Sequence, residues 1–126
     1  MKKFILFAIA LTACGKSPGG SITLNFPAGL ITNGILHGAV FETGQCSTLG
    51  DSVVLTDALV RVSHPANFDA QNEHPMTLSA IPAGDNRMVV AVVEQDGTQI
   101  CRACSDGVTI NDSATSTVRL ILEGCP

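Results

Sequence analysis

The stretch that decides the fold runs from residue 76 to residue 122: MTLSAIPAGDNRMVVAVVEQDGTQICRACSDGVTINDSATSTVRLIL. Apolar residues alternate with polar ones or form short β-branched runs, and turn-forming residues separate these runs. Asp96-Gly97, between two such runs, predicts a tight β-hairpin. We therefore expect five strands in this stretch, with turns at 82–85 and 105–107 between them. These strands cover residues 76–81, 87–94, 98–103, 108–110 and 116–122.

The residues before this stretch continue the pattern. Alternation predicts strands over 22–26, 35–41 and 58–62, and the apolar residues 53–55 lead towards the last of these. The segment 63–75 is polar and contains two prolines, so we expect a long exposed loop there. Short strands with turns between them, and almost no helical periodicity, predict an all-β fold. The expected architecture is a single antiparallel β-sandwich, Ig-like or prealbumin-like, with seven or eight strands over residues 21–126.

The C-terminal stretch also resembles a known class of modules. It resembles carboxypeptidase-regulatory-like or prealbumin-like sandwich modules in the order of its elements. These are a strand, Pro-Ala-Gly, a long hydrophobic strand, Asp-x-Gly-like hairpin residues and a closing V-x-I…V-x-L pattern. The resemblance covers roughly the last 50 residues, and the N-terminal half departs from it. It implies a spacer or binding domain, because modules of this family are mostly non-enzymatic.

Residues 1–13 have the features of a secretion signal. Two lysines precede an apolar run at 4–11, which is far shorter than the roughly 20 residues that a membrane-spanning helix needs. Leu11-Thr12-Ala13-Cys14 then resembles the lipobox of bacterial lipoproteins. The resemblance implies cleavage before Cys14 and acylation of that cysteine, including a palmitate-type chain, with several acyl chains giving stable membrane anchoring. Residues 14–20 would be the lipidated cysteine and a flexible Gly/Ser/Pro linker.

The residue after the lipobox bears on localisation. Gly15, and not Asp, follows the cysteine, and this resembles the pattern that permits sorting to the outer membrane. We therefore expect the protein in the bacterial cell envelope, anchored by lipid to the outer membrane, on either its periplasmic face or its surface. The bilayer itself, and another envelope protein, are the expected partners.

Composition limits the functions that remain. Removing the first 13 of 126 residues leaves 113, the size of one domain, with five basic residues against eleven acidic ones. An acidic domain is a poor nucleic-acid binder, because neutralisation of phosphates supplies most of that affinity. Trp and Tyr are absent, and Phe26, Phe41 and Phe68 are the only phenylalanines left, so the usual stacking platforms for bases or sugars are lacking.

Four cysteines remain after Cys14: Cys46, Cys101, Cys104 and Cys125. An even number in an oxidising compartment predicts two disulfides. If the last two predicted strands form a hairpin that turns near Ser113, Cys101 faces Cys125 and Cys46 is left for Cys104. A slightly shifted turn would instead pair Cys104 with Cys125 and Cys46 with Cys101. We expect either arrangement in preference to a local Cys101–Cys104 bond.

Other chemistries have weaker support. Cys101-Arg102-Ala103-Cys104 is not followed by the helix that a thioredoxin-type redox pair needs. It also lacks the second closely spaced pair of ligands of a zinc ribbon, and the histidine that follows the second cysteine of a haem attachment site. His64 and His74 flank the 63–75 loop, and we expect exposed loop histidines there, not metal ligands. His37, in an apolar strand, is expected to be a hydrogen-bonded sheet residue. No G-x-S-x-G or G-x-x-x-x-G-K-[ST] motif occurs, so no catalytic residue, metal or cofactor is expected.

The sequence thus predicts a membrane-anchored envelope lipoprotein that is a non-enzymatic binding or structural module. The 63–75 loop, with Phe68 between His64 and His74, is the expected contact surface for a partner, because loops on a rigid scaffold carry recognition. One alternative is a periplasmic redox or metal-binding protein that uses Cys101 and Cys104. Another is a ligand- or carbohydrate-binding module.

Overall fold

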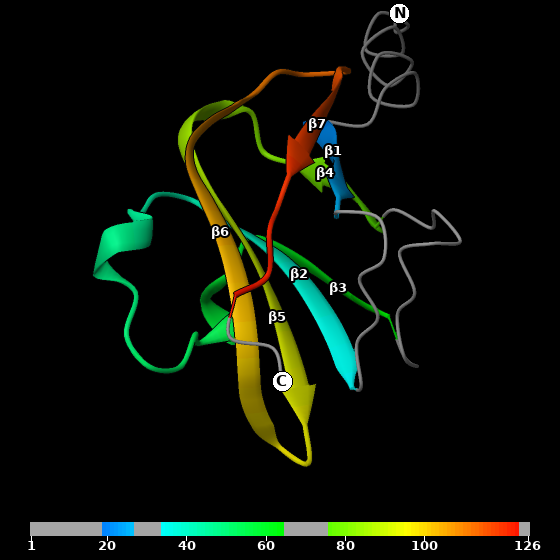
Figure 1. Ribbon diagram of the computed structural model, residues 1–126. Coiled ribbons are helices and arrows are strands. Elements are labelled where there is room, and N and C mark those ends of the chain that lie inside the picture. The colour runs from blue at the N-terminus through cyan, green and yellow to red at the C-terminus, as the bar shows by residue number, and fades with distance from the viewer. Residues whose placement is uncertain (1–18, 27–33, 65–75, 124–126) are drawn as a thin grey trace, which may run out of the picture.

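Seven β-strands form two sheets in the computed structural model, which describes residues 19–26, 34–64 and 76–123. One sheet has the strand order β4-β1-β7, and the other has the order β3-β2-β5-β6 (Figure 1). Two single-turn 3₁₀ helices lie between β2 and β3. The elements are β1 (Gly20–Asn25), β2 (Ile35–Phe41), η1 (Cys46–Thr48), η2 (Leu55–Asp57), β3 (Val60–His64), β4 (Met76–Ile81), β5 (Gly84–Gln95), β6 (Thr98–Ile110) and β7 (Thr115–Arg119).

The two sheets pack face to face around one apolar core. In β1 and β4, buried apolar side chains that face the other sheet alternate with more exposed ones, as the period of two requires, and Val60 and Val62 of β3 pack on the same core while partly buried. Ile22 and Leu24 of β1 and Leu36 of β2 have no exposed surface. The prediction of an all-β sandwich is therefore confirmed, with the sheets rich in antiparallel pairs.

The hairpin of β5 and β6 is the longest part of the larger sheet. Asp96 and Gly97 both have positive φ, 52° and 82°, which is the backbone of the two-residue turn that the Asp-Gly pair predicts. The expected turn at 105–107 is wrong, because β6 continues through it to Ile110. Gly107, with φ of 66°, instead lies in a β-bulge, where β6 has one more residue than β5.

β7 corrects a second expectation. The predicted hairpin between the strand ending at Ile110 and the last strand does not form, because β7 crosses to the other sheet and pairs with β1 in parallel, from Ser21↔Thr115 to Asn25↔Arg119. This is the one parallel pair among the described strands. Alternation in a sequence identifies a strand and its buried face, but it does not specify the neighbouring strand.

Strand boundaries near β3 also differ from expectation. Residues 53–55 do not lead into β3 as a strand, since Leu55 begins the 3₁₀ helix η2. Ser63 and His64, expected at the start of an exposed loop, are the last residues of β3. Residues 65–75 of that expected loop lie outside the described residues.

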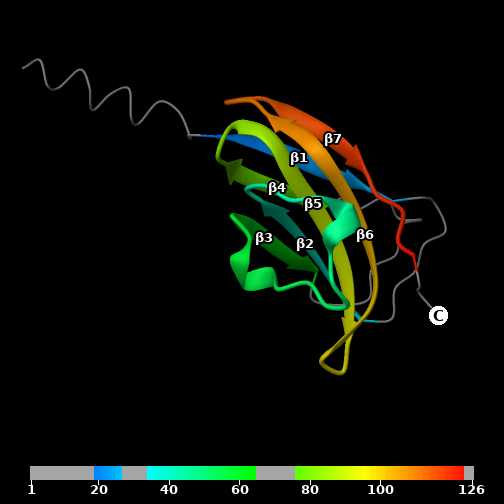
Figure 2. The same cartoon turned by 90° about the vertical axis from the view of Figure 1, so that its left-hand side faces the viewer.

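The connection between β2 and β3, residues 42–59, covers part of the outer face of the larger sheet. Figure 2 shows it in front of β5 and β6. Val53 of this connection packs on Met88, Val90 and Val92, which point outwards from β5, and these residues form a second apolar cluster. The outer face of β5 is therefore apolar because the chain folds back over it.

Candidate functional site

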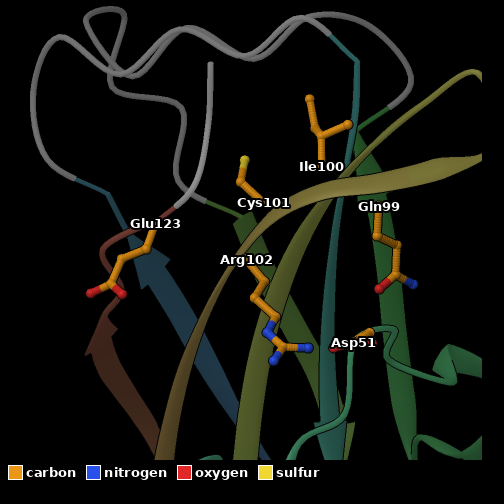
Figure 3. Close-up of a pocket in the computed structure, with 6 residues that line it drawn as sticks. All are labelled: Asp51, Gln99, Ile100, Cys101, Arg102 and Glu123. Atoms are coloured by element: carbon orange, nitrogen blue, oxygen red, sulfur yellow. The ribbon is translucent and has the colours of Figure 1, made fainter.

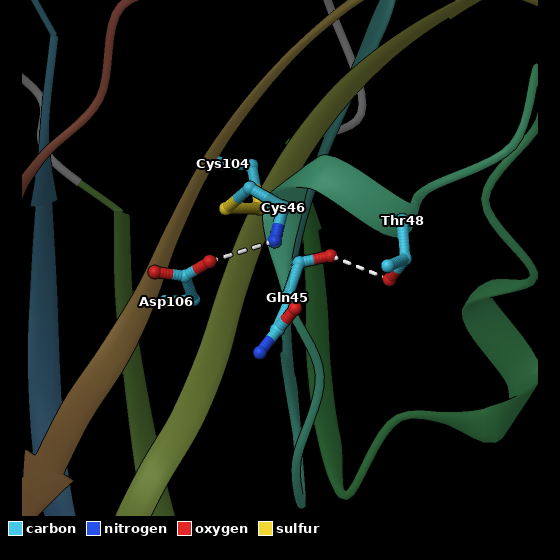
Figure 4. The surroundings of a disulfide bond; sticks show 5 residues. All are labelled: Gln45, Cys46, Thr48, Cys104 and Asp106. Atoms are coloured by element: carbon cyan, nitrogen blue, oxygen red, sulfur yellow. Dashed lines mark hydrogen bonds between the residues drawn. A yellow bond between two sulfur atoms is a disulfide. The ribbon is translucent and has the colours of Figure 1, made fainter.

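A disulfide fixes the covering connection to β6. Cys46 is bonded to Cys104, with Cα atoms 5.7 Å apart, and the Cys46 amide also donates to Asp106 Oδ2 over 2.7 Å (Figure 4). This pairing belongs to the first of the two predicted arrangements. Cys101 and Cys104 are three residues apart in one strand, so they point to opposite faces and are not bonded to each other. Cys101 is itself disulfide-bonded, and Cys125, its predicted partner, lies outside the described residues.

Two further side chains of β6 hold the connection without covalent bonds. The Gln99 amide donates to the Val53 carbonyl and accepts from the Val53 amide, each over 2.8 Å, as a neighbouring backbone strand would. Arg102 Nη1 donates to the Gly50 carbonyl. No local pattern in the sequence indicates these contacts, because each joins residues about 50 positions apart.

Arg87 holds the other end of the same connection. Its guanidinium is buried, with 8% of the residue exposed, and it donates to the carbonyls of Pro82, Ala83 and Glu42 at 2.7–3.2 Å. A buried cation is tolerated only when it is fully hydrogen-bonded. Arg87 therefore joins the turn before β5 to the start of the connection after β2.

A hollow of about 180 Å³ lies where the covering connection, β6 and Glu123 meet. Its lining side chains do not converge on one point: Ile100 and Cys101 point one way, and Gln99 and Arg102 another (Figure 3). Within the described ranges, no three His, Cys, Asp or Glu side chains are placed to hold a metal ion. The hollow is lined by Asp51, Gln99, Ile100, Cys101, Arg102 and Glu123.

A second polar cluster lies on the outer face of the larger sheet. His37 of β2 is hydrogen-bonded through both ring nitrogens, Nδ1 at 2.6 Å from Ser63 Oγ and Nε2 at 3.0 Å from Glu94 Oε1. His37 and Ser63 are direct cross-strand partners, and Glu94 lies on the strand at the other side of His37. Sequence reasoning identified His37 as a hydrogen-bonded sheet residue but missed both of its partners, which are 26 and 57 positions away.

The expected partner-contact residues are only partly described. His64 is half-buried at the end of β3, while Phe68 and His74 lie outside the described residues. In the part of the chain that the structure covers, no helix has the length and apolar character needed to cross a membrane.

Comparisons with protein-family models, with curated proteins and with solved structures find no match to this chain. The resemblance to carboxypeptidase-regulatory-like or prealbumin-like modules, and the resemblance to the lipobox, therefore remain predictions from the sequence.

Proposed function

We propose that this protein is a lipid-anchored lipoprotein of the bacterial envelope whose β-sandwich is a non-enzymatic binding or structural module. The observation that carries the proposal is the lipobox-like Leu11-Thr12-Ala13-Cys14, placed between an apolar signal-like run and Gly19, the first residue that the structure describes. Acylation of Cys14 would supply the anchor, and only a few residues would separate it from the folded domain.

The beginning of the fold supports a short tether. Gly19 donates to Asp112 Oδ1 over 2.9 Å, and its carbonyl accepts from the Ser113 amide, also over 2.9 Å. Five residue steps separate Cys14 from Gly19, which allow a reach of at most about 18 Å. The end of the sandwich that carries residues 111–114 would therefore stay near the lipid headgroups.

The opposite end of the domain would then be the part most accessible to a partner. β5 has 12 residues, so the Asp96-Gly97 turn lies up to about 40 Å along the strand from Gly84. Figure 1 shows this turn and the first residues of β1 at opposite ends of the molecule. Of the predicted contact residues, His64 fits this orientation, because it pairs with Leu36, which in turn pairs with Val93 close to that turn.

Intact mass spectrometry of the protein from bacterial membranes tests the anchor. We expect loss of residues 1–13, an added acyl mass on Cys14, and a gain of about 4 Da on reduction, two hydrogens for each of two disulfides. The matched control is Cys14→Ser, which should carry no acyl mass. A mature protein without acyl mass, or a C14S protein that still carries it, would refute the anchor.

The redox or metal-binding alternative predicts a different result in the same sample. It requires Cys101 and Cys104 to be a reducible pair or to hold a metal in the native protein. The observed bond between Cys46 and Cys104 favours structural disulfides instead. Titration of free thiols before denaturation separates the two, because a structural pair gives no reactive thiol.

A further inference from the structure

Ser63, His37 and Glu94 form a continuous hydrogen-bonded chain across three adjacent strands. The order β3-β2-β5 places the three side chains side by side on the outer face of the sheet. The distances are 2.6 Å from Ser63 Oγ to His37 Nδ1 and 3.0 Å from His37 Nε2 to Glu94 Oε1. Because each residue belongs to a paired strand, the backbone fixes their spacing more firmly than a loop would.

The partners decide where the protons lie. An ionised Glu94 carboxylate can only accept, so in the neutral ring His37 Nε2 carries the hydrogen. Nδ1 then has a free lone pair and accepts the hydroxyl hydrogen of Ser63. A hydroxyl that donates to a base, which is itself oriented by a third group, is the arrangement that activates a serine nucleophile.

Exposure makes the serine accessible. Ser63 is exposed, whereas the His37 side chain is only 15% exposed and that of Glu94 is 35% exposed. Arg61 is exposed two residues before Ser63, on the same face of β3. Within the described part of the chain, no hydrogen bond or ion pair engages the Arg61 guanidinium, so it is free to attract an anionic group.

We propose that Ser63 is a covalent acyl-acceptor site, with His37 as the general base and Glu94 as the residue that positions His37. In this step, Ser63 Oγ forms a bond to the carbonyl carbon of an activated ester or thioester. The leaving group departs with its bonding electron pair, and the hydroxyl proton passes to His37 Nδ1 and then to that leaving group. Arg61 would favour acyl donors that carry a carboxylate or phosphate.

Acyl acceptance by Ser63 would be a function beyond the proposed binding role, and it does not depend on the lipid anchor. Since Ser63 is at an exposed strand position, we expect it to accept one acyl group per chain without turnover.

The test uses a fluorophosphonate probe on the folded protein with its disulfides intact. Attack by Ser63 forms an Oγ–P bond and releases fluoride, so the expected product is one adduct per chain, mapped to Ser63 by peptide mass spectrometry. Ser63→Ala should abolish it. The matched control is Ser79→Ala, because Ser79 is also exposed on a strand, and this variant should label like the wild type.

Variants of the other two residues test the mechanism. His37→Asn should slow labelling at least about 100-fold, the usual contribution of a general base. Glu94→Leu should slow it as well, and Glu94→Gln, whose amide oxygen still accepts from Nε2, should restore part of the rate. Unchanged thermal unfolding shows that each variant is folded, and a variant that unfolds is replaced by His37→Gln or Glu94→Asn.

A second probe tests the role of Arg61. A nitrophenyl ester that carries a carboxylate should acylate Ser63 faster than nitrophenyl acetate does, and Arg61→Gln should remove this difference. Labelling of Ser63 no faster than labelling of Ser79, or labelling that survives unchanged in His37→Asn, would overturn the proposal.

Discussion

Removal of the Cys46–Cys104 bond should lower stability by several kcal/mol without detaching the connection that the bond fixes. The two cysteines are 58 positions apart, so the bond closes a long loop in the unfolded chain. The chain-entropy relation for a loop of this size gives a loss of about 4 kcal/mol at 25 °C. For a domain of about 100 residues, that loss corresponds to a decrease in Tm of roughly 15–20 °C.

The variant to measure is Cys46→Ala with Cys104→Ala, since a single substitution would leave a thiol free to exchange with the remaining disulfide. Guanidinium unfolding without reductant gives the free energy of unfolding. The matched control is Val54→Ala in the same connection, because Val54 is 59% exposed and its truncation should change stability by less than about 0.5 kcal/mol.

Hydrogen exchange separates the two parts of this reasoning. The Val53 amide donates to the Gln99 side chain, which the double substitution leaves in place. Relative to the lowered global stability, the Val53 amide should therefore remain protected in the double variant. A stability loss below about 1 kcal/mol would refute the loop-closure estimate, and selective loss of Val53 protection would show that the disulfide alone keeps the connection docked.

Two further substitutions test local features of the fold. Arg87→Met should destabilise the protein by about 2–3 kcal/mol in chemical denaturation, because it leaves the carbonyls of Pro82, Ala83 and Glu42 without their donor. An Arg87→Lys variant as stable as the wild type would contradict this account. Gly97→Ala should lower the stability by about 1 kcal/mol, measured as a lower Tm, because φ is 82° at this position and no atom lies near enough to clash with an added Cβ. A loss of stability above about 3 kcal/mol would indicate a cause other than backbone strain.

The covering connection explains why the outer face of the larger sheet has two characters. Where residues 42–59 lie over it, the face is apolar: Val53 of the connection packs on Val90 of the sheet, and the Cys46–Cys104 disulfide joins the connection to β6. Beyond that cover, at His37 and Ser63, the same face is polar and reaches the surface. The proposed acyl-acceptor chain occurs where the cover ends.

Much of the strand pattern could be predicted from the sequence, because it depends on local chemistry. Alternation of apolar and polar residues identified β2 and β4 at their observed bounds, and Asp96-Gly97 identified the hairpin. The pairing of Cys46 with Cys104 was one of two predicted arrangements, although it rested on a hairpin of the last strand that does not form.

The sequence by itself determined the fold class and most of the strands, since the period of two and the turn residues act over a few positions. Only the tertiary structure decided the partner of each strand: the parallel pairing of β7 with β1, and the meeting of Ser63, His37 and Glu94. The physical reason is that a strand can satisfy its hydrogen bonds with any neighbour. The choice among neighbours depends on how the two sheets together bury their apolar faces, which no short stretch of sequence encodes.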